Sequence, residues 1–230
     1  MIPQDPPFHE DMPRLPYPNF YYSLEDLLVS YSKSFTYSIH RVSCIIGAST
    51  RSAYNLLLTL CVYATICKHE GLVFHYPGTK YTWEHFCDAT DVRVLAKQHI
   101  WAAVTERAQN EAFNCTNGDF FTWKSFWKVL CEIVRVEYVE FDGSGEKFDF
   151  VEEMNKKGKV WDTIVEKYGL YETKLDEITC FETVNLVMNF GFQHVSSMNK
   201  SREFGFVGHV DTLKSIKMWV ERFREMKFIP

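Results

Sequence analysis

Two adjacent tyrosines, Tyr21 and Tyr22, are the residues of this sequence best suited to acid–base chemistry. A lysine ammonium one helical turn from a tyrosine favours the tyrosinate, and the phenol can then stabilise or protonate an oxyanion. The positions four residues further along hold Glu25 and Asp26 instead of lysine. Spacing alone therefore leaves two interpretations of the pair, a catalytic role or ordinary packing at a helix start.

The remaining motifs indicate chemistry more weakly. Gly143-Ser-Gly145 follows a predicted strand, but a dinucleotide loop needs a third glycine and an apolar helix after it, so a surface turn is favoured. His85 and Cys87 could ligate a metal, but no second pair lies at ligand spacing, and no metal site is predicted. His99 lies on the apolar face of a predicted helix, where we expect a buried core histidine.

The composition is that of a folded chain without a surface for nucleic acid or membrane. The 230 residues are 46% hydrophobic, which suffices for a core, and the net charge of −5 argues against clustered Lys and Arg. No segment has the ~18 uncharged residues of a membrane span. The first residues lack the pattern of a signal peptide, and the seven cysteines form no CxxC pair. We therefore expect a cytoplasmic protein with reduced core cysteines.

Periodicity and capping residues predict mixed helices and strands, which is typical of an α/β fold. The first helix is predicted to begin at Asn19 or Ser23 and to run to Ser32. Asp88 or Asp91 is predicted to cap a later helix. The other helices are predicted over 56–67 (closed by Gly71), 92–103, 122–133 (capped by Thr122), 161–168 (closed by Gly169), 175–198 and 211–223 (capped by Asp211). Strands are predicted over 36–41, 72–75, 112–115 and 136–141.

The run Asn19-Phe-Tyr-Tyr22 followed by Glu25-Asp26 resembles the signature of progesterone 5β-reductase and iridoid synthase-like enzymes. These form the PRISE family of extended short-chain dehydrogenases/reductases. The resemblance covers essentially the whole chain. Further matches are Asp5-Pro-Pro7, Glu10–Leu15, Ser38-Ile-His-Arg41, Leu60–Tyr63, Ile66–Gly71, His99–Ala103, Asn110–Asn114, Trp123–Leu130 and Ser197–Ser201.

The resemblance implies a partial Rossmann-type α/β fold that lacks its first nucleotide-binding half, joined to a smaller, largely helical substrate-binding part. Residues 1–230 would then be a single C-terminal portion of an NAD(P)-binding reductase. Residues 1–48 and 110–117 would be the remnant of the Rossmann sheet, and the remainder the substrate-binding part. The glycine-rich loop and the catalytic lysine are expected in the missing half.

The resemblance also implies a reaction. Family members use NADPH to reduce a C=C bond conjugated to a carbonyl, with hydride added at the β-carbon and the enolate oxygen stabilised by a tyrosine and a lysine. The first tyrosine of the pair, Tyr21, would be catalytic. The implied partner is a small enone or a steroid, and a homodimer is compatible with the family.

Other site residues follow from the same resemblance. The family's nicotinamide-side motif matches at His40, Arg41, Ile45 and Ser52, which together with Tyr21 are predicted to bind the cofactor. Strand-end packing is the competing interpretation of the first two. Tyr54 and Phe181 are predicted to contact substrate, with core packing the alternative for Tyr54. Val42, Ala48 and Thr50 replace a proline, a phenylalanine and a second proline of the family motif, which would loosen this loop.

Two functional hypotheses follow. The chain is either part of an NADPH-dependent enone reductase, or a non-catalytic remnant that binds a small apolar molecule without a cofactor. Under both hypotheses, the absence of the first half would expose the strand at 36–41 and the helix that carries Tyr21.

Overall fold

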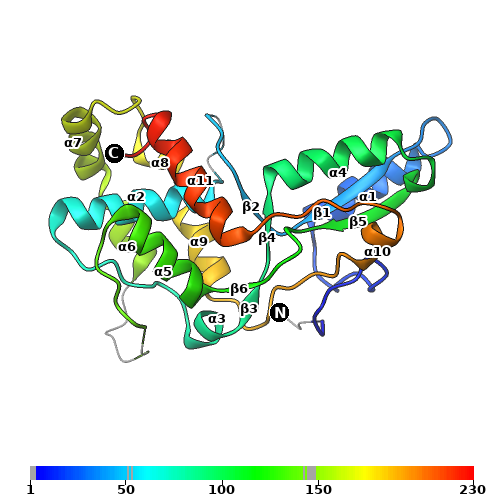
Figure 1. Ribbon diagram of the computed structural model, residues 1–230, viewed down its shortest axis with the longest axis horizontal. Coiled ribbons are helices and arrows are strands. Elements are labelled where there is room, and N and C mark those ends of the chain that lie inside the picture. Colours follow the sequence, from blue (N-terminus) through cyan, green and yellow to red (C-terminus); the bar gives the residue numbers. More distant parts are fainter. Residues whose placement is uncertain (1–3, 51, 53, 142, 144–148) are drawn as a thin grey trace.

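A computed structural model describes residues 4–50, 52, 54–141, 143 and 149–230. The molecule is elongated, with most helices gathered at one end and a small α/β unit at the other (Figure 1). The C-terminus lies at the helical end. Two residues of the predicted turn at Gly143-Ser-Gly145, Ser144 and Gly145, lie outside the described ranges.

The helical end is built around α2 (Leu56–Glu70), which is buried on nearly all sides. A helix that is apolar all round must be surrounded by other elements. The main hydrophobic cluster supplies them from α5 (Trp123–Val134), α7 (Gly158–Tyr168), α9 (Phe181–Met188) and α11 (Thr212–Glu225). Two shorter helices, α6 (Phe150–Asn155) and α8 (Leu175–Ile178), pack against α9 and α7. The α3 helix (Lys80–Glu84) lies at the edge of this cluster.

The described strands form three two-stranded sheets. Two of them are parallel: β1 (Ser38–Val42) pairs with β5 (Glu111–Cys115), and β2 (Cys44–Ile46) pairs with β4 (Ala89–Asp91). The third, β3 (Phe86–Cys87) with β6 (Phe121–Thr122), is antiparallel. The parallel pairs are joined through helices, as in a Rossmann-type α/β fold.

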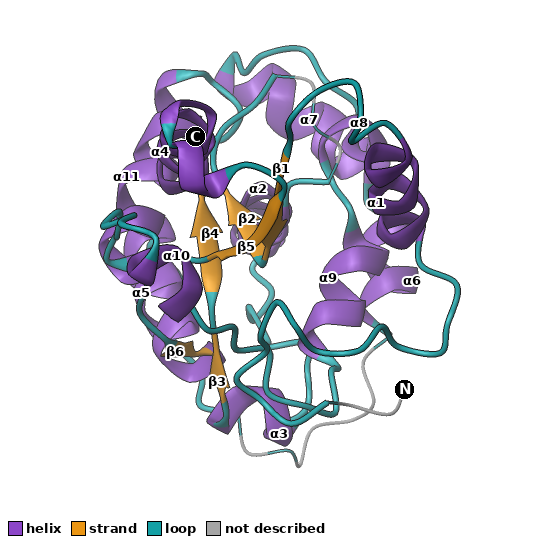
Figure 2. Ribbon diagram, turned by 90° about the vertical axis from the view of Figure 1, so that its right-hand side faces the viewer, coloured by secondary structure: helices purple, strands orange, loops and turns teal. Residues whose placement is uncertain are grey.

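The small α/β unit places a helix on each face of the β1–β5 pair (Figure 2). One is α4 (Val92–Val104) and the other is α1 (Phe20–Ser30). A short helix, α10 (Asn199–Glu203), and a 3-10 turn, Glu106–Ala108, pack at its far end (Figure 1). The α4 helix lies outside the two ranges predicted for the Rossmann sheet, yet it packs directly on β1.

Most predicted helices are confirmed, including their caps. Asn19 caps α1, since its Oδ1 accepts a hydrogen bond from the Tyr21 backbone N–H at 2.9 Å. Asp91, not Asp88, caps α4. The capping residues of α5 and α11 are Thr122 and Asp211, as predicted. The predicted strands at 36–41 and 112–115 are present as β1 and β5, and all seven cysteines are free, six of them buried.

Two predicted strands are wrong. Residues 72–75 and 136–141 form no strand, because their backbone groups and side chains find other partners. The Tyr63 hydroxyl donates to the His75 carbonyl at 3.1 Å, and the Trp127 indole N–H donates to the Phe74 carbonyl at 3.4 Å. In the second segment, Tyr138 stacks on Trp83. Side chains of the helical core therefore replace a neighbouring strand.

The long helix predicted over 175–198 is also wrong as a single element. It is broken between α8 and α9, where the Cys180 N–H donates to the buried Thr59 hydroxyl at 3.0 Å. After α9 the chain is extended, because its backbone pairs with distant segments. Phe8 N–H donates to the Val195 carbonyl at 2.8 Å, and Asp88 N–H donates to the His194 carbonyl at 2.9 Å.

The burial predicted for His99 is wrong as well. The side of α4 that packs inward carries Val94, Gln98 and Ala102, and His99 is exposed. The helix has apolar residues on both sides, and Gln98 is accommodated inside because it hydrogen-bonds to His40 and to the Asn114 carbonyl.

Within the described ranges, no helix has both the length and the apolar character needed to cross a bilayer.

Candidate active site

The two tyrosines at the start of α1 have different surroundings. The Tyr22 hydroxyl accepts a hydrogen bond from the Leu15 N–H at 3.0 Å, and the Arg14 guanidinium lies 4.8 Å from the centre of its ring. Tyr21 is 64% exposed, and its ring contacts only that of Phe20, edge to face at 5.2 Å, among the described aromatic pairs. The position of the Tyr22 side chain is thus fixed by contacts within the chain, whereas the Tyr21 side chain is exposed to solvent.

The carboxylates that stand where a lysine would be needed are already paired. Glu25 is largely buried and receives two hydrogen bonds from Arg41, at 2.9 and 3.0 Å. Asp26 pairs with Arg14 at 2.7 Å. A third hydrogen bond from Arg41, at 2.8 Å, reaches the Glu10 carbonyl. Arg41 therefore ties β1 to α1 and to the N-terminal segment, and this fork fixes the position of the helix that carries the tyrosines.

His40 lies on the opposite face of β1 from Arg41. Its Nδ1 lies 2.7 Å from Oε1 of Gln98, and its Nε2 lies 3.0 Å from the Ser38 hydroxyl. Burial lowers the pKa of His40 below its usual value, partly offset by the Gln98 hydrogen bond. Its ring also contacts His99 at 4.3 Å. The structure thus separates these two predicted cofactor residues onto different faces.

The other predicted site residues lie apart. Ile45 in β2 is 43% exposed, and Ser52 is half-buried. Tyr54 is 80% exposed, so it is not a core residue. Phe181 lies in the main core at 2% exposure, with its ring edge-on to Phe150. The roles of these residues in binding cofactor or substrate stay predictions.

A cavity of about 310 Å³ opens at the carboxyl ends of the parallel β1–β5 pair. This is the edge of a parallel sheet at which α/β proteins bind ligands. Arg41, Val42 and Asn114 come from the strands, and Tyr22 contributes from α1. The N-terminal segment supplies Phe8, His9, Met12 and Arg14, and the extended chain after α9 supplies Phe192, His194 and Ser196. Tyr21 is not among the lining residues.

His9 and His194 are titratable groups of this cavity for which the sequence predicts no role, and His194 has the more developed hydrogen-bond network. Its Nδ1 lies 3.1 Å from the Ser43 hydroxyl oxygen, and that hydroxyl donates to the Asp88 carbonyl at 3.0 Å. Since the serine hydrogen is committed, Nδ1–H must be the donor to Ser43, which leaves Nε2 as an acceptor in the neutral ring. The buried Asp88 carboxylate lies 3.4 Å from the same Nδ1. This arrangement can hold a histidine in one tautomer beside a bound molecule.

No sequence signal identified this cluster. His194 is one of eight scattered histidines, and Asp88 was considered only as a helix cap. The Ser196 N–H donates to Oδ2 of Asp88 at 2.5 Å, so the carboxylate's role is to fix the extended segment that follows α9. Contacts between residues more than a hundred positions apart cannot be read from spacing. The one available hint is an acid enclosed by apolar neighbours, at Phe86-Cys-Asp88.

Comparison with known protein families gives one match. The model of the PRISE-like Rossmann-fold domain matches residues 2–230. An (S)-8-oxocitronellyl enol synthase of Camptotheca acuminata is 46% identical over 99% of this chain, and a 3-oxo-Delta(4,5)-steroid 5-beta-reductase of Arabidopsis thaliana is 43% identical over 98% of it. This chain covers 59% of the first relative's length and 58% of the second's.

Solved structures agree with the fold. A UDP-glucuronic acid 4-epimerase from Bacillus cereus, in complex with NAD, superposes with a TM-score of 0.57 at 13% identity, over 95% of this chain and 56% of the epimerase. The RMD protein of Pseudomonas aeruginosa, complexed with NADPH, gives a TM-score of 0.54 at 12% identity, over 95% of this chain and 59% of that one. At such low identity the likeness shows a Rossmann-like α/β architecture alone.

Proposed function

This chain belongs to the PRISE-like Rossmann-fold family, and from that membership we propose that it is the substrate-side portion of a nicotinamide-dependent enone reductase. The reaction is the reduction of a C=C bond conjugated to a carbonyl, on a Δ4-3-ketosteroid, a small enone or 8-oxogeranial. The protein acts in the cytoplasm with NADPH. The observation that carries the proposal is the exposed phenol of Tyr21 at the start of α1, between Asn19 and Tyr22, which both line the cavity at the carboxyl ends of β1 and β5.

The contacts around the pair support Tyr21 over Tyr22 as the catalytic group. A phenol that stabilises an enolate must offer its O–H to the substrate oxygen. The Tyr22 oxygen accepts the Leu15 N–H and its ring lies under Arg14, so its orientation is fixed by the chain and not by a substrate. The Tyr21 oxygen is exposed, and the Asn19 cap and the Arg41–Glu25 fork fix its helix. Tyr21 then donates a proton or hydrogen bond to the substrate oxygen.

The described residues fit the nicotinamide end of a dinucleotide and not its phosphates. The cavity at the carboxyl ends of β1 and β5 has room for a ring, and His194 offers it an acceptor. Arg41 donates three hydrogen bonds to groups of this chain, and both ring nitrogens of His40 have hydrogen-bond partners in it, so neither side chain is free to bind a phosphate. No glycine-rich loop occurs in the sequence to cradle phosphates. When bound, the cofactor would supply hydride to the β-carbon of the enone.

The internal pairing of His40 and Arg41 also favours the second candidate function. If neither side chain is free to hold a cofactor, the cavity could take a small apolar molecule against Phe8, Met12 and Phe192 without any reaction. The same experiment distinguishes the two functions.

The test is a chimera in which this chain replaces the matched region of the Camptotheca acuminata relative. We expect NADPH consumption with 8-oxogeranial or progesterone. In this chimera, Tyr21→Phe should lower kcat by about 10²-fold or more, because proton transfer to the substrate oxygen is lost. Tyr22→Phe should change kcat by less than about fivefold and reduce stability by about 1 kcal/mol, through its backbone hydrogen bond.

Each other outcome has a defined meaning. Equal losses in the two variants, or a larger loss for Tyr22→Phe, would refute the assignment of Tyr21. A folded chimera that binds 8-oxogeranial but consumes no NADPH would support the non-catalytic function.

A further inference from the structure

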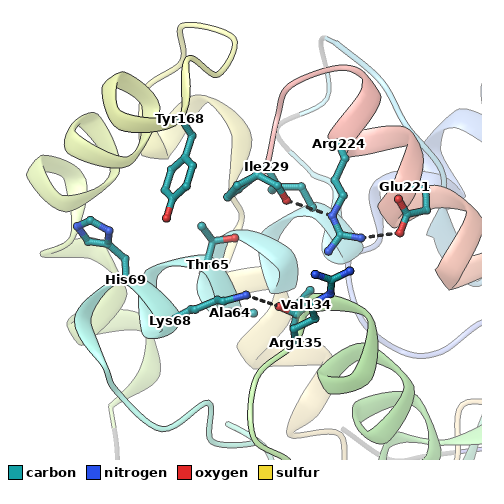
Figure 3. Close-up of a pocket in the computed structure, with 11 residues that line it drawn as sticks. Ala64, Thr65, Lys68, His69, Val134, Arg135, Tyr168, Glu221, Arg224 and Ile229 are labelled. Carbon is teal, nitrogen blue, oxygen red and sulfur yellow. Dashed lines mark hydrogen bonds and ion pairs between the residues drawn. The ribbon is translucent and has the colours of Figure 1, made fainter.

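A second cavity lies at the other end of the molecule from Tyr21, between α2, α5, α7 and α11 (Figures 1 and 3). Its volume is about 360 Å³, within the usual range for small-molecule sites of ~300–1,000 Å³. None of its lining residues belongs to the candidate active site, and the sequence predicts no cofactor or substrate contact for any of them. An inference drawn from it is therefore independent of the proposed function.

Three cations line this cavity, and one of them is fully paired. Arg224 of α11 donates to the Glu221 carboxylate at 2.5 Å, to the Pro230 carbonyl at 3.1 Å and to the Ile133 carbonyl at 2.8 Å. Its charge is balanced by Glu221. Arg224 is thus a structural group that anchors the end of α11 to α5.

The other two cations, Lys68 and Arg135, keep their charge uncompensated. Lys68 donates one hydrogen bond to the Val134 carbonyl at 3.2 Å, which leaves two ammonium hydrogens free. Its neighbour Glu70 is committed to Lys157 at 2.8 Å. Among the residues that the structure describes, no acid lies within ion-pair distance of Lys68 or Arg135. In the 230-residue chain the lining sets Lys68, Arg135 and Arg224 against the Glu221 carboxylate and the α-carboxylate of Pro230. The cavity therefore carries a net positive charge in a chain whose net charge is −5.

Arg135 occupies a backbone position better suited to glycine. It follows α5 with φ of 58°, the left-handed conformation that also ends α2 at Gly71 and α7 at Gly169. A side chain in this conformation costs ~1 kcal/mol relative to glycine. Arg135 nevertheless occupies this position, and its guanidinium lines the cavity opposite that of Arg224 (Figure 3). An anion between α5 and α2 would relieve this repulsion of like charges.

The opposite wall combines apolar surface with two hydroxyls and the His69 imidazole, whose buried Nδ1 has no hydrogen-bond partner among the described residues. Ala64 and Ile229 supply apolar surface, and the Tyr168 side chain descends from α7 with its hydroxyl directed toward Thr65 of α2 (Figure 3). A ligand that fills the cavity must therefore combine an oxyanion at one end with an apolar body at the other.

We propose that this cavity binds a small organic anion, a carboxylate or a phosphate ester with a compact apolar body. The oxyanion lies between Lys68 and Arg135, which together offer several charged donors. The body lies against Ile229 and the ring of Tyr168. The site touches α2, whose packing orders the whole helical end of the molecule.

The test uses two fluorinated probes, 4-fluorophenyl phosphate and 4-fluorobenzoate, observed by ligand 19F NMR with the 230-residue chain. At least one of them should bind saturably, and the neutral 4-fluorobenzyl alcohol should bind at least tenfold more weakly. The preferred probe distinguishes a phosphate ligand from a carboxylate ligand. Arg135→Gly should weaken binding at least tenfold while leaving the Tm unchanged or higher, because glycine suits the left-handed position.

Lys217→Gln is the matched control, since Lys217 is an exposed lysine of α11 outside the cavity and its loss changes the net charge equally. It should leave the affinity within twofold. If Arg135→Gly lowers the Tm, Lys68→Gln replaces it as the deciding variant. The proposal is overturned if neither anion binds saturably, if the neutral alcohol binds as tightly, or if the deciding variant retains the affinity of the parent chain.

Discussion

At the scale of single residues, the structure divides pairs of neighbours that look equivalent in the sequence. Tyr21 is exposed, whereas Tyr22 is hydrogen-bonded to the chain. His40 faces α4 and Arg41 faces α1. Gln98 is buried, whereas His99 is exposed to solvent. In the Tyr21–Tyr22 and Gln98–His99 pairs one residue has its polar atoms satisfied by the chain, and in the His40–Arg41 pair both do. The candidates for binding an external molecule are those that remain, Tyr21 foremost.

The neutral state of His40 gives a prediction about pH. Because burial lowers its pKa in the folded protein, the unfolded chain takes up a proton at a higher pH than the folded one does. Stability should therefore be full above the unfolded pKa of ~6.5 and should fall as pH decreases below it. His40→Gln should flatten this dependence of the free energy of unfolding, measured by urea denaturation between pH 5 and 7.5.

His209 provides the control for this measurement, because it is an exposed histidine. His209→Gln should leave the pH dependence unchanged. A slope that is the same in the parent chain and in His40→Gln would show that His40 carries no part of it.

At the scale of elements, Asp91 joins β4 to two helices. Its side chain caps α4 through the Arg93 N–H at 2.8 Å, pairs with the Arg93 guanidinium and accepts hydrogen bonds from Ser215 and from the Trp219 indole of α11. Burial alone would raise the pKa of Asp91, but hydrogen bonds from Arg93, Ser215 and Trp219 outweigh it and lower the pKa to about 2.

Asp91→Asn should therefore destabilise the protein by about 2–4 kcal/mol, measured by urea denaturation at pH 7. In the parent chain, the contribution of this carboxylate is full above the unfolded pKa of ~3.9 and is lost as pH falls toward 2. Asp211→Asn is the matched control, because Asp211 caps α11 in the same way at an exposed position, where asparagine caps equally well. A loss as small as that of the control would contradict the role given to Asp91.

The sequence was sufficient for elements whose signals are local. The caps at Asn19, Thr122 and Asp211, the glycine ends at Gly71 and Gly169, and the strands at 36–41 and 112–115 depend on neighbours a few residues away. The wrong predictions occur where contacts between residues far apart in the sequence determine the conformation. Residues 72–75 hydrogen-bond to core side chains, and the chain after Met188 pairs with Phe8 and Asp88, which spacing cannot reveal.

The candidate site was predictable only in part, for the same reason. Family resemblance selected Tyr21, His40 and Arg41, which lie at or near the open end of the β1–β5 pair. The His194, Ser43 and Asp88 cluster was missed because its members are brought together from three separate segments.

At the scale of the whole molecule, α1 leaves an apolar surface without a cover. None of the apolar residues of α1 is buried, and Phe20, Leu24, Leu27 and the C-cap residue Tyr31 recur at helical spacing with exposures of 69%, 45%, 57% and 54%. The adjacent strand β1 pairs only with β5 among the described strands, so one of its edges is also free. Exposed apolar stripes and free strand edges promote association.

We therefore expect the 230-residue chain to self-associate as its concentration rises, measured by sedimentation velocity. Replacing Leu24 and Leu27 together by glutamine should raise the dissociation constant by about tenfold or more, since each leucine loses ~1 kcal/mol of burial. Leu186→Gln, at an equally exposed leucine of α9, should have little effect. A chain that stays monomeric at all concentrations would disprove the role of this surface.

The enclosure of α2 has a consequence for how the protein is made. The helix is complete at Glu70, but α11, which covers one of its sides, ends at Glu225, roughly 150 residues later. At ~5–20 residues per second, a ribosome needs roughly 10–30 s to add them. During that interval the helix with the most buried residues lacks one of its covering elements, and it is the segment that a chaperone would hold until α11 has been made.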